Sequence, residues 1–382
     1  MTQFDDIRPY CDDEVRPTVE RLLGDDEFID IIIRFLCPKL PRYLSGFCRP
    51  IIRYFLDRKL RNVQTVNDLQ RYIESYIRRM LNETTLGLTI SGEENLTRER
   101  AHLFISNHRD IVADPAVVNW TLLQRGHKTL HVAVGDNLLT KPCVSDLMRL
   151  NKSFIVNRSA KGSREKFKAA KHLSSYVHHA ITKEQSNIWI AQREGRAKDG
   201  IDRTNSAVIS MLALHKPKSL PLTDCIHELN IVPVSISYER DPCDILKAKE
   251  LYIQGSEGRY QKAEYEDVAS IAQGITGFKG RVHVAFGAPL DGEYQTVGGV
   301  VAELDQKIIH NYVLQPSNCV AYEKLHGELP EGVVVTADQV PFLEADFAME
   351  CQQFNDHVCQ CDEAYRNILL SMYANPIVSQ YS

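Results

Sequence analysis

No run of about 18 apolar residues occurs in this chain of 382 residues, so we expect no single helix that crosses a membrane. The most apolar early stretch, residues 28–36, is interrupted by Asp30 and Arg34. A mean hydropathy of -0.27 also disfavours a polytopic membrane protein. The first residues are acidic and do not have the basic start and apolar core of a secretory signal, so we expect no export.

The ten cysteines have no spacing typical of a disulfide framework. Without an export signal, we expect reduced thiols in a cytosol. The one cluster, Cys351, Cys359 and Cys361 with His357 between them, does not have the C-x-x-C spacing that turns two thiolates toward one zinc ion. We interpret these residues as ordinary buried cysteines and predict no metal site.

Several motifs of known enzyme classes are also missing. The chain has no G-x-S-x-G nucleophile motif, no Walker A motif and no G-x-G-x-x-G dinucleotide motif. An isoelectric point of about 6.2, without a basic sheet lined by aromatic residues, argues against nucleic-acid binding.

Charge is distributed unevenly along the N-terminal part of the chain. Residues 1–30 hold ten acids against three arginines, whereas residues 31–80 hold eleven basic residues against three acids. The basic residues are interleaved with Ile, Leu, Phe and Tyr, a pattern that suits an anionic membrane surface. Alternatively, the basic face packs on the acidic leader, and the sequence leaves both interpretations open.

The texture of the sequence predicts three segments. Residues 1–85 have helical spacing, and Thr65 with Asp68 resembles a capping box before the last of these helices. Residues 86–310 alternate short apolar runs with longer periodic stretches, which predicts an α/β fold: a central, mixed but mostly parallel sheet flanked by helices. Residues 311–382 lose this alternation and predict a helical tail, centred on residues 342–373.

The predicted strands and helices of the middle segment can be listed by residue. The expected strands are His102–Ser106, Leu130–Val134, Ser153–Asn157, Asn187–Ala191, Ile231–Ile236 and Val282–Phe286. The expected helices are Pro115–Gln124, Arg164–Thr182 and Asn205–Leu214. The second of these helices is basic enough to attract an acidic acyl carrier protein, although a solvated face is the simpler interpretation.

Chemistry-bearing residues follow the predicted strands, where ligands of α/β sheets collect. The first loop, SNHRDIVADPAV, places His108 and carboxylates between a strand and a helix, and an imidazole bonded to a carboxylate is a general base. Arg158 follows the strand SFIVN, and WIAQREGRAKDG carries Arg193, Arg196 and Lys198 beside a glycine turn. Such a cluster suits a phosphate dianion. A base and a phosphate clamp fit a reacting hydroxyl that belongs to the substrate.

Four segments together resemble the ordered motif blocks of the glycerolipid acyltransferase family, which includes glycerol-3-phosphate, lysophosphatidate and dihydroxyacetone-phosphate acyltransferases. They are SNHRDIVADPAV, FIVNR, WIAQREGRAKDG and IVPVSISYE, and KGRVHVAFGAPL resembles a late strand of the family. The resemblance covers roughly residues 86–290. Four blocks in order are specific for the superfamily, whereas one block would be weak.

The resemblance implies a role for each matching residue. His108 would be the general base, Asp114 would orient it, and Arg158, Arg196 and Lys198 would hold the phosphate of the acceptor. Supporting positions match Asn107, Asp110, Arg193, Glu194, Gly195 and Pro233, the last in a strand that would shape the acyl site.

The sequence departs from the family pattern in three places. Five residues separate His108 from Asp114 where the family has four, so either the turn bulges or Asp110 takes the role of the acid; we favour Asp114. Lys152 stands where the second block usually begins with glycine, and the third block has Arg193 and Arg196 in place of its usual proline and threonine.

The resemblance implies an O-acyltransferase of phospholipid synthesis. It would move a fatty acyl group from acyl-CoA or acyl carrier protein to a hydroxyl of glycerol 3-phosphate or a lysophosphatidate, without a bound cofactor. We expect a cytoplasmic protein that is peripheral at the inner face of a membrane. The alternative is a catalytically silent relative that docks on anionic membranes through residues 31–80.

Overall fold

The structure is a computed structural model that describes residues 3–37, 40–41, 44–139, 141–262, 266–333 and 344–381. Its contacts divide the chain into two units. The first unit holds residues 1–77 and 130–177, and the second holds residues 78–129 and 178–382. The three segments predicted from the sequence remain a prediction about the chain's domains.

The first unit is largely helical, as predicted for the N-terminal segment. Its helices are α1 (Asp12–Gly24), α2 (Asp26–Leu36), α3 (Ser45–Leu60), the first part of α4 (Val66–Thr84), α6 (Pro142–Leu150) and most of α7 (Ser163–Thr182). The strands β3 (His131–Gly135) and β4 (Ser153–Val156) pair in parallel. Thr65 and Asp68 form the predicted reciprocal bonds at the start of α4: the Thr65 amide donates to the carboxylate, and the Asp68 amide donates to the hydroxyl.

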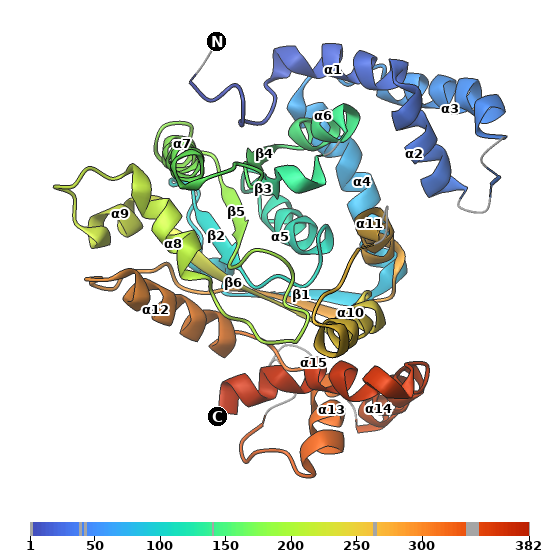
Figure 1. Cartoon of the computed structure of the whole chain (residues 1–382), viewed down its shortest axis with the longest axis vertical. Helices are drawn as coiled ribbons and strands as arrows, with labels where there is room; N and C mark the ends of the chain where they lie inside the picture. The colour runs from blue at the N-terminus through green and yellow to red at the C-terminus, as the bar shows by residue number, and fades with distance from the viewer. Residues whose placement is uncertain are drawn as a thin grey trace. The chain divides into compact units, whose positions relative to one another are not determined.

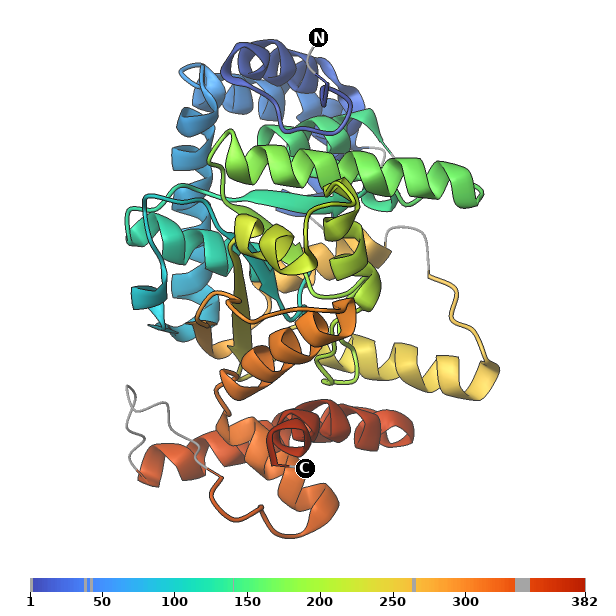
Figure 2. The same ribbon diagram turned by 90° about the vertical axis from the view of Figure 1, so that its left-hand side faces the viewer.

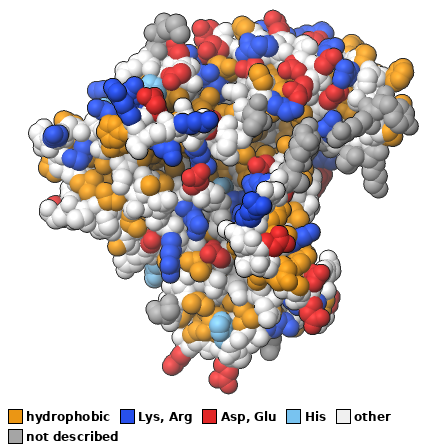
Figure 3. All heavy atoms as spheres, viewed as in Figure 1, with side chains coloured by type: hydrophobic (Ala, Val, Ile, Leu, Met, Phe, Trp, Pro, Cys, Tyr) orange, Lys and Arg blue, Asp and Glu red, His pale blue; other side chains and the backbone are white. Residues whose placement is uncertain are grey.

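Two basic residues of α3 form ion pairs with acids of the preceding helix. Arg49 donates to both Asp26 and Asp30, and Arg53 donates to Asp26 and to the carbonyl of Leu23. Acidic and basic side chains accordingly alternate over α1–α3 at the upper right of Figure 3. Of the two interpretations that the sequence left open, these two arginines therefore follow the second, in which the basic face packs on the acidic leader. Lys39 and Arg42 of the same basic segment lie outside the described residues.

The second unit is built on a mixed, mostly parallel sheet with the strand order β1-β7-β6-β2-β5 (Figure 1). These strands are β1 (Thr85–Ser91), β7 (Gly280–Phe286), β6 (Ile231–Tyr238), β2 (Leu103–Ser106) and β5 (Ile188–Ala191). Only the β6–β7 pairing is antiparallel. The predicted fold class is thus confirmed.

Helices flank this sheet, and the last three form the C-terminal part of the unit. They are α5 (Ala113–Gln124), α8 (Ser206–Leu212), α9 (Leu222–Leu229), α10 (Asp244–Glu257), α11 (Glu266–Thr276), α12 (Val297–His310), α13 (Pro316–His326), α14 (Glu344–Cys359) and α15 (Glu363–Tyr381). Both views show α13, α14 and α15 lying together (Figures 1 and 2). The predicted tail is helical, and α15 packs on α10, α12 and α13.

The six strands expected from apolar runs all form, within one or two residues of their predicted ends. The sequence did not reveal β1, because its side chains are only half-buried or exposed and show no apolar run. The cysteine interpretation holds only in part: Cys361 is buried in the C-terminal core, Cys351 is half-buried and Cys359 is exposed. Within the described ranges, the helices include none that is both long and apolar enough to cross a membrane.

Candidate active site

The loop between β2 and α5 brings His108 and Asp114 together. His108 follows β2 by two residues, and Asp114 lies in the first turn of α5. The Nδ1 atom of His108 is 2.8 Å from the Oδ2 atom of Asp114. Of the two carboxylates that the sequence left open, Asp114 is therefore the one that contacts the imidazole.

Asp114 is fully buried and accepts four hydrogen bonds. Its Oδ2 atom accepts from His108 and from the backbone amides of Arg109 and Asp110, at 2.7 and 3.0 Å. Its Oδ1 atom accepts from the hydroxyl of Tyr238 at 2.9 Å. Burial raises the pKa of that hydroxyl well above its ordinary value, which keeps the tyrosine a donor. The two backbone amides and the tyrosine hydroxyl all donate to this carboxylate, so Asp114 acts as an acceptor.

The imidazole of His108 is held in one orientation. Because Asp114 only accepts, Nδ1 carries the proton and Nε2 carries the lone pair. Nε2 makes no hydrogen bond with any residue in the described part of the chain, and 13% of the side chain is exposed. The edge of the ring lies against Trp189 of β5. This geometry leaves Nε2, beyond the carboxyl end of β2, as the ring nitrogen that can act as a base.

Asp110 explains the extra residue in the motif. Its Oδ1 atom accepts from the amides of Val112 and Ala113, at 2.9 and 2.8 Å, so it closes the turn that precedes α5. The turn absorbs one residue, and Asp114 still reaches His108. Burial and the neighbouring Asp114 raise the pKa of Asp110. Asp110 therefore shapes the turn, and it does not contact the imidazole in this structure.

Asn107 ties this loop to the rest of the sheet. Its side-chain oxygen accepts from the amide of Ile236, and its nitrogen donates to the carbonyl of Ile236 and to Asp202. The resemblance implied a supporting role for Asn107, which would polarise or position the base. The contacts give a physical route for that role, because they fix the backbone immediately before His108.

The arginine loop, residues 193–202, is bonded through backbone and side-chain atoms to the base loop, residues 107–112 between β2 and α5. The amide of Ala197 donates to the carbonyl of His108 at 2.7 Å. Arg109 is buried, forms an ion pair with Asp202 and donates to the carbonyls of Ala197 and Gly200. Sequence reasoning missed Arg109, since an arginine beside the motif reads equally well as a surface residue.

The two predicted phosphate ligands of this loop differ in their surroundings. Arg196 has a buried Nη1 atom without a hydrogen-bond partner among the described residues. Such a donor gains most from an anionic ligand, because an unpaired buried donor is costly. Lys198 instead forms an ion pair with Glu250 of α10, which already neutralises its charge. Arg193 is half-buried and Glu194 is exposed, and Gly195 between them and Arg196 has a φ of +74° that suits glycine.

The two remaining predicted residues are Arg158 and Pro233. Arg158 belongs to the first unit, after β4, and its backbone amide donates to Asp136. Pro233 is buried in β6, opposite Ile105 of β2, and its carbonyl accepts from the amide of Gly287. The roles of both residues in substrate binding stay predictions.

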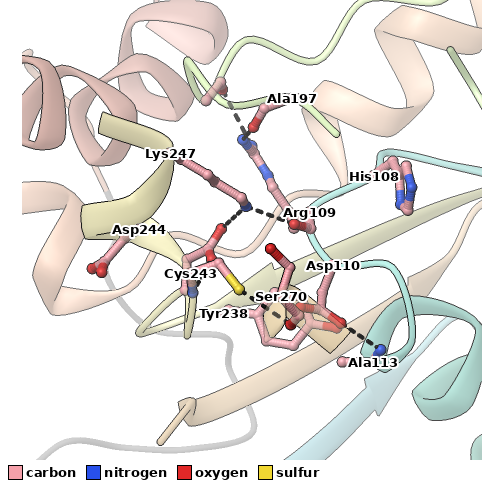
Figure 4. A network of polar contacts seen from close by, with 12 residues as sticks. His108, Arg109, Asp110, Ala113, Ala197, Tyr238, Cys243, Asp244, Lys247 and Ser270 are labelled. Atoms are coloured by element: carbon pink, nitrogen blue, oxygen red, sulfur yellow. Dashed lines mark hydrogen bonds and ion pairs between the residues drawn. The ribbon is translucent and has the colours of Figure 1, made fainter. Parts of the chain in front are cut away.

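A buried lysine also donates a hydrogen bond to the base loop. Lys247 of α10 is 1% exposed, and it donates to the carbonyl of Arg109 at 2.6 Å while pairing with Asp241 (Figure 4). Neither Tyr238 nor Lys247 was found from the sequence. Tyr238 could have been noticed, because it ends the VPVSISY strand next to the predicted site, but the position of Lys247 depends on how α10 packs.

Comparisons with known proteins address the family. Residues 87–237 match the family model Acyltransferase. Among solved structures, the chain is similar to the 1-acyl-sn-glycerophosphate acyltransferase PlsC from Thermotoga maritima, at 14% identity and a TM-score of 0.38, covering 77% of this chain and 94% of that one. A likeness of that strength carries no argument. No curated protein matches the chain. The matched segment contains His108, Asp114 and the arginine loop, and it lies within the range over which the motif blocks resemble the glycerolipid acyltransferase family.

Proposed function

We propose that this protein is an O-acyltransferase that transfers a fatty acyl group from a thioester to a hydroxyl of a phosphorylated glycerol. The observation that carries the proposal is the buried Asp114 bonded to Nδ1 of His108, with Nε2 unbonded among the described residues beside the arginine loop. The acceptor is glycerol 3-phosphate or a lysophosphatidate, and the donor is acyl-CoA or acyl carrier protein. No bound cofactor takes part in the proposed reaction.

The residues suggest a direct transfer. Nε2 of His108 takes the proton of the acceptor hydroxyl while its oxygen attacks the thioester carbonyl. The tetrahedral intermediate collapses, the C–S bond breaks, and the thiolate leaves with the proton that His108 held. Asp114 stabilises the imidazolium between these steps. Arg196, with Arg158 and Lys198 as further candidates, binds the acceptor's phosphate.

Replacing His108 with alanine tests the proposal. The wild-type protein is incubated with acyl-CoA or acyl carrier protein and a panel of phosphorylated acceptors, and the products are identified by mass spectrometry. We expect His108→Ala to lower kcat by about 1,000-fold or more, because loss of the base removes proton transfer.

A matched control comes from His178, whose Nε2 atom bonds Glu228 at 2.9 Å. His178→Ala removes a second histidine–carboxylate pair and should leave activity unchanged. Near-normal transfer by His108→Ala would end the proposal. A wild-type protein that transfers nothing to any acceptor, while binding vesicles, would instead favour the silent membrane-docking relative.

We further propose that the protein contacts an anionic bilayer through α3. Four large side chains on this helix, Phe47, Ile51, Tyr54 and Phe55, are each more than half exposed. Their spacing places them on one face, whereas Cys48, Ile52, Leu56 and Leu60 pack toward the core. Exposed aromatic residues flanked by bases suit the headgroup region. Since Arg49 and Arg53 are already paired, the apolar face contributes more than their charge does.

Vesicle flotation tests this contact. The double variant Phe47→Ser with Phe55→Ser should lower binding to anionic vesicles about tenfold or more, and moderate salt should weaken wild-type binding only partly. Phe278→Ser, which removes another half-exposed phenylalanine in the second unit, is the control. Undiminished binding by the double variant would contradict the role of the apolar face of α3. Equal binding to neutral vesicles at high salt would contradict the preference for an anionic bilayer.

A further inference from the structure

The helix α15 contacts the arginine loop directly. The side-chain amide of Asn375 donates to the carbonyl of Asp199 at 2.7 Å. The next residue, Gly200, has a φ of +77° and lies so close to Met372 that an added Cβ would stand 2.0 Å from the Met372 carbonyl oxygen. Backbone packing this close leaves the loop little freedom on that side.

The opposite side of the same loop segment is held by the base loop. The carbonyl of Gly200 accepts from Arg109, and Asp202 forms an ion pair with Arg109. Residues 199–202 therefore contact both α15 and Arg109, the residue that follows His108. Arg196 and Lys198 project from the stretch immediately before these residues.

A second chain of contacts runs from α15 to the base loop itself. The hydroxyl of Tyr373 accepts from the amide of Asp241 at 2.9 Å and donates to Asp244 at 2.7 Å. Asp241 pairs with Lys247, which donates to the carbonyl of Arg109. Tyr373, Asp241, Asp244 and Lys247 are all buried, so water does not compete for these bonds.

We infer that α15 is a positioning element for acyl transfer. Asn375 holds the arginine loop in place, and Tyr373 holds the base loop in place through Asp241 and Lys247. This inference rests on the proposed function for its kinetic consequence. The family match ends at residue 237, so the helix lies outside the matched segment. The two contacts predict two separable effects, one on acceptor binding and one on turnover.

Two variants of the full chain separate the effects. Asn375→Ala should raise the KM for the phosphorylated acceptor about tenfold, with kcat and the KM for the acyl thioester within about twofold of wild type. Tyr373→Phe keeps the ring and removes the hydroxyl, and it should lower kcat about tenfold with little change in the acceptor KM. A general loss of folded protein would lower kcat in both variants without this split.

Gln380 supplies the matched control. It is a second side-chain amide on α15, and it donates to the carbonyls of Ile309 and Tyr312 rather than to the loop. Gln380→Ala should leave both parameters unchanged. If Gln380→Ala raised the acceptor KM as much as Asn375→Ala, the effect would belong to the stability of the helix and the inference would be overturned.

Hydrogen–deuterium exchange keeps the test independent of turnover. The amides of Ala197 and Ile201 are bonded in this structure, to the carbonyl of His108 and to Asp199. We expect Asn375→Ala to speed their exchange several-fold, while Gln380→Ala does not. Unchanged exchange at 197–202 would overturn the positioning role, whereas a wild-type protein without any acyl transfer would overturn the proposed function alone.

Discussion

The two helical regions at either end of the chain are stabilised in different ways. In the N-terminal helices α1–α3, the polar contacts include ion pairs on partly exposed side chains, such as Arg49 with Asp30. In the C-terminal helices α13–α15, the polar contacts include buried bonds to backbone groups near the candidate active site, such as the bond that the Tyr373 hydroxyl accepts from the amide of Asp241. Exposed ion pairs contribute little to stability, whereas a buried polar group that loses its partner is costly.

This difference separates two uses of a helical segment. The N-terminal helices leave the apolar face of α3 uncovered, which suits contact with another surface. The C-terminal helices bury apolar side chains in a core around Phe354 and Leu369, and they contact the arginine loop at Asp199 and the turn before α10 at Asp241. One helical region thus exposes an apolar face, whereas the other buries its apolar side chains.

The largest effect should come from the closest contact of the C-terminal region. In Gly200→Ala, the new Cβ would meet the Met372 carbonyl at 2.0 Å on a backbone with positive φ, so we expect the free energy of unfolding to fall by about 3 kcal/mol. Denaturant titration measures it. Gly258→Ala, at a similar φ but with no atom within 4 Å, should cost only about 1 kcal/mol. Equal losses would show that α15 yields to the clash.

An intermediate effect should come from acid, and it should spare the N-terminal helices. His283 of β7 bonds the hydroxyls of Thr89 and Ser91, and burial lowers its pKa from 6.5 to about 4. Burial lowers the pKa of His102 to about 4 as well. Between pH 6.5 and 4 the unfolded chain therefore binds protons that the folded protein does not, so stability falls as the pH falls and levels off below about 4.

We expect each of these histidines to contribute a loss of about 2 kcal/mol at pH 5 relative to pH 7. Denaturant titrations across this pH range measure the loss, and His283→Gln should reduce its slope. Residues 1–77 contain no histidine, so α1–α3 contribute no histidine protonation to this loss. If His283→Gln left the pH dependence of the free energy of unfolding unchanged, the protons bound on unfolding would belong to other groups.

The smallest effect should come from the N-terminal ion pairs. Arg49→Met breaks both ion pairs with α2, yet these side chains are partly exposed, so we expect the Tm to shift by about 1 °C or less. Salt at 1 M should remove most of that shift, since it screens exposed charges. A loss as large as that of Gly200→Ala would break the comparison between the two regions.

The strands and the base motif were predictable because their signals are local. Apolar runs mark buried strands, and the residues that follow a strand must lie at its end. The pairing of His108 with Asp114 across five intervening residues was predictable only as the favoured of two options. The choice depends on the turn that Asp110 closes before α5, and a turn of that kind is set by backbone geometry rather than by spacing.

The residue types at the candidate site can be read from the sequence: an imidazole with carboxylates after one strand, and a basic loop after another. Which of these groups meet depends on how the chain folds. Lys198 is neutralised by Glu250, Arg196 keeps an unpaired donor among the described residues, and α15 contacts the loop from more than 170 residues away in the chain. Such pairings follow from the packing of distant helices, because burial selects partners by position in space and not by separation in sequence.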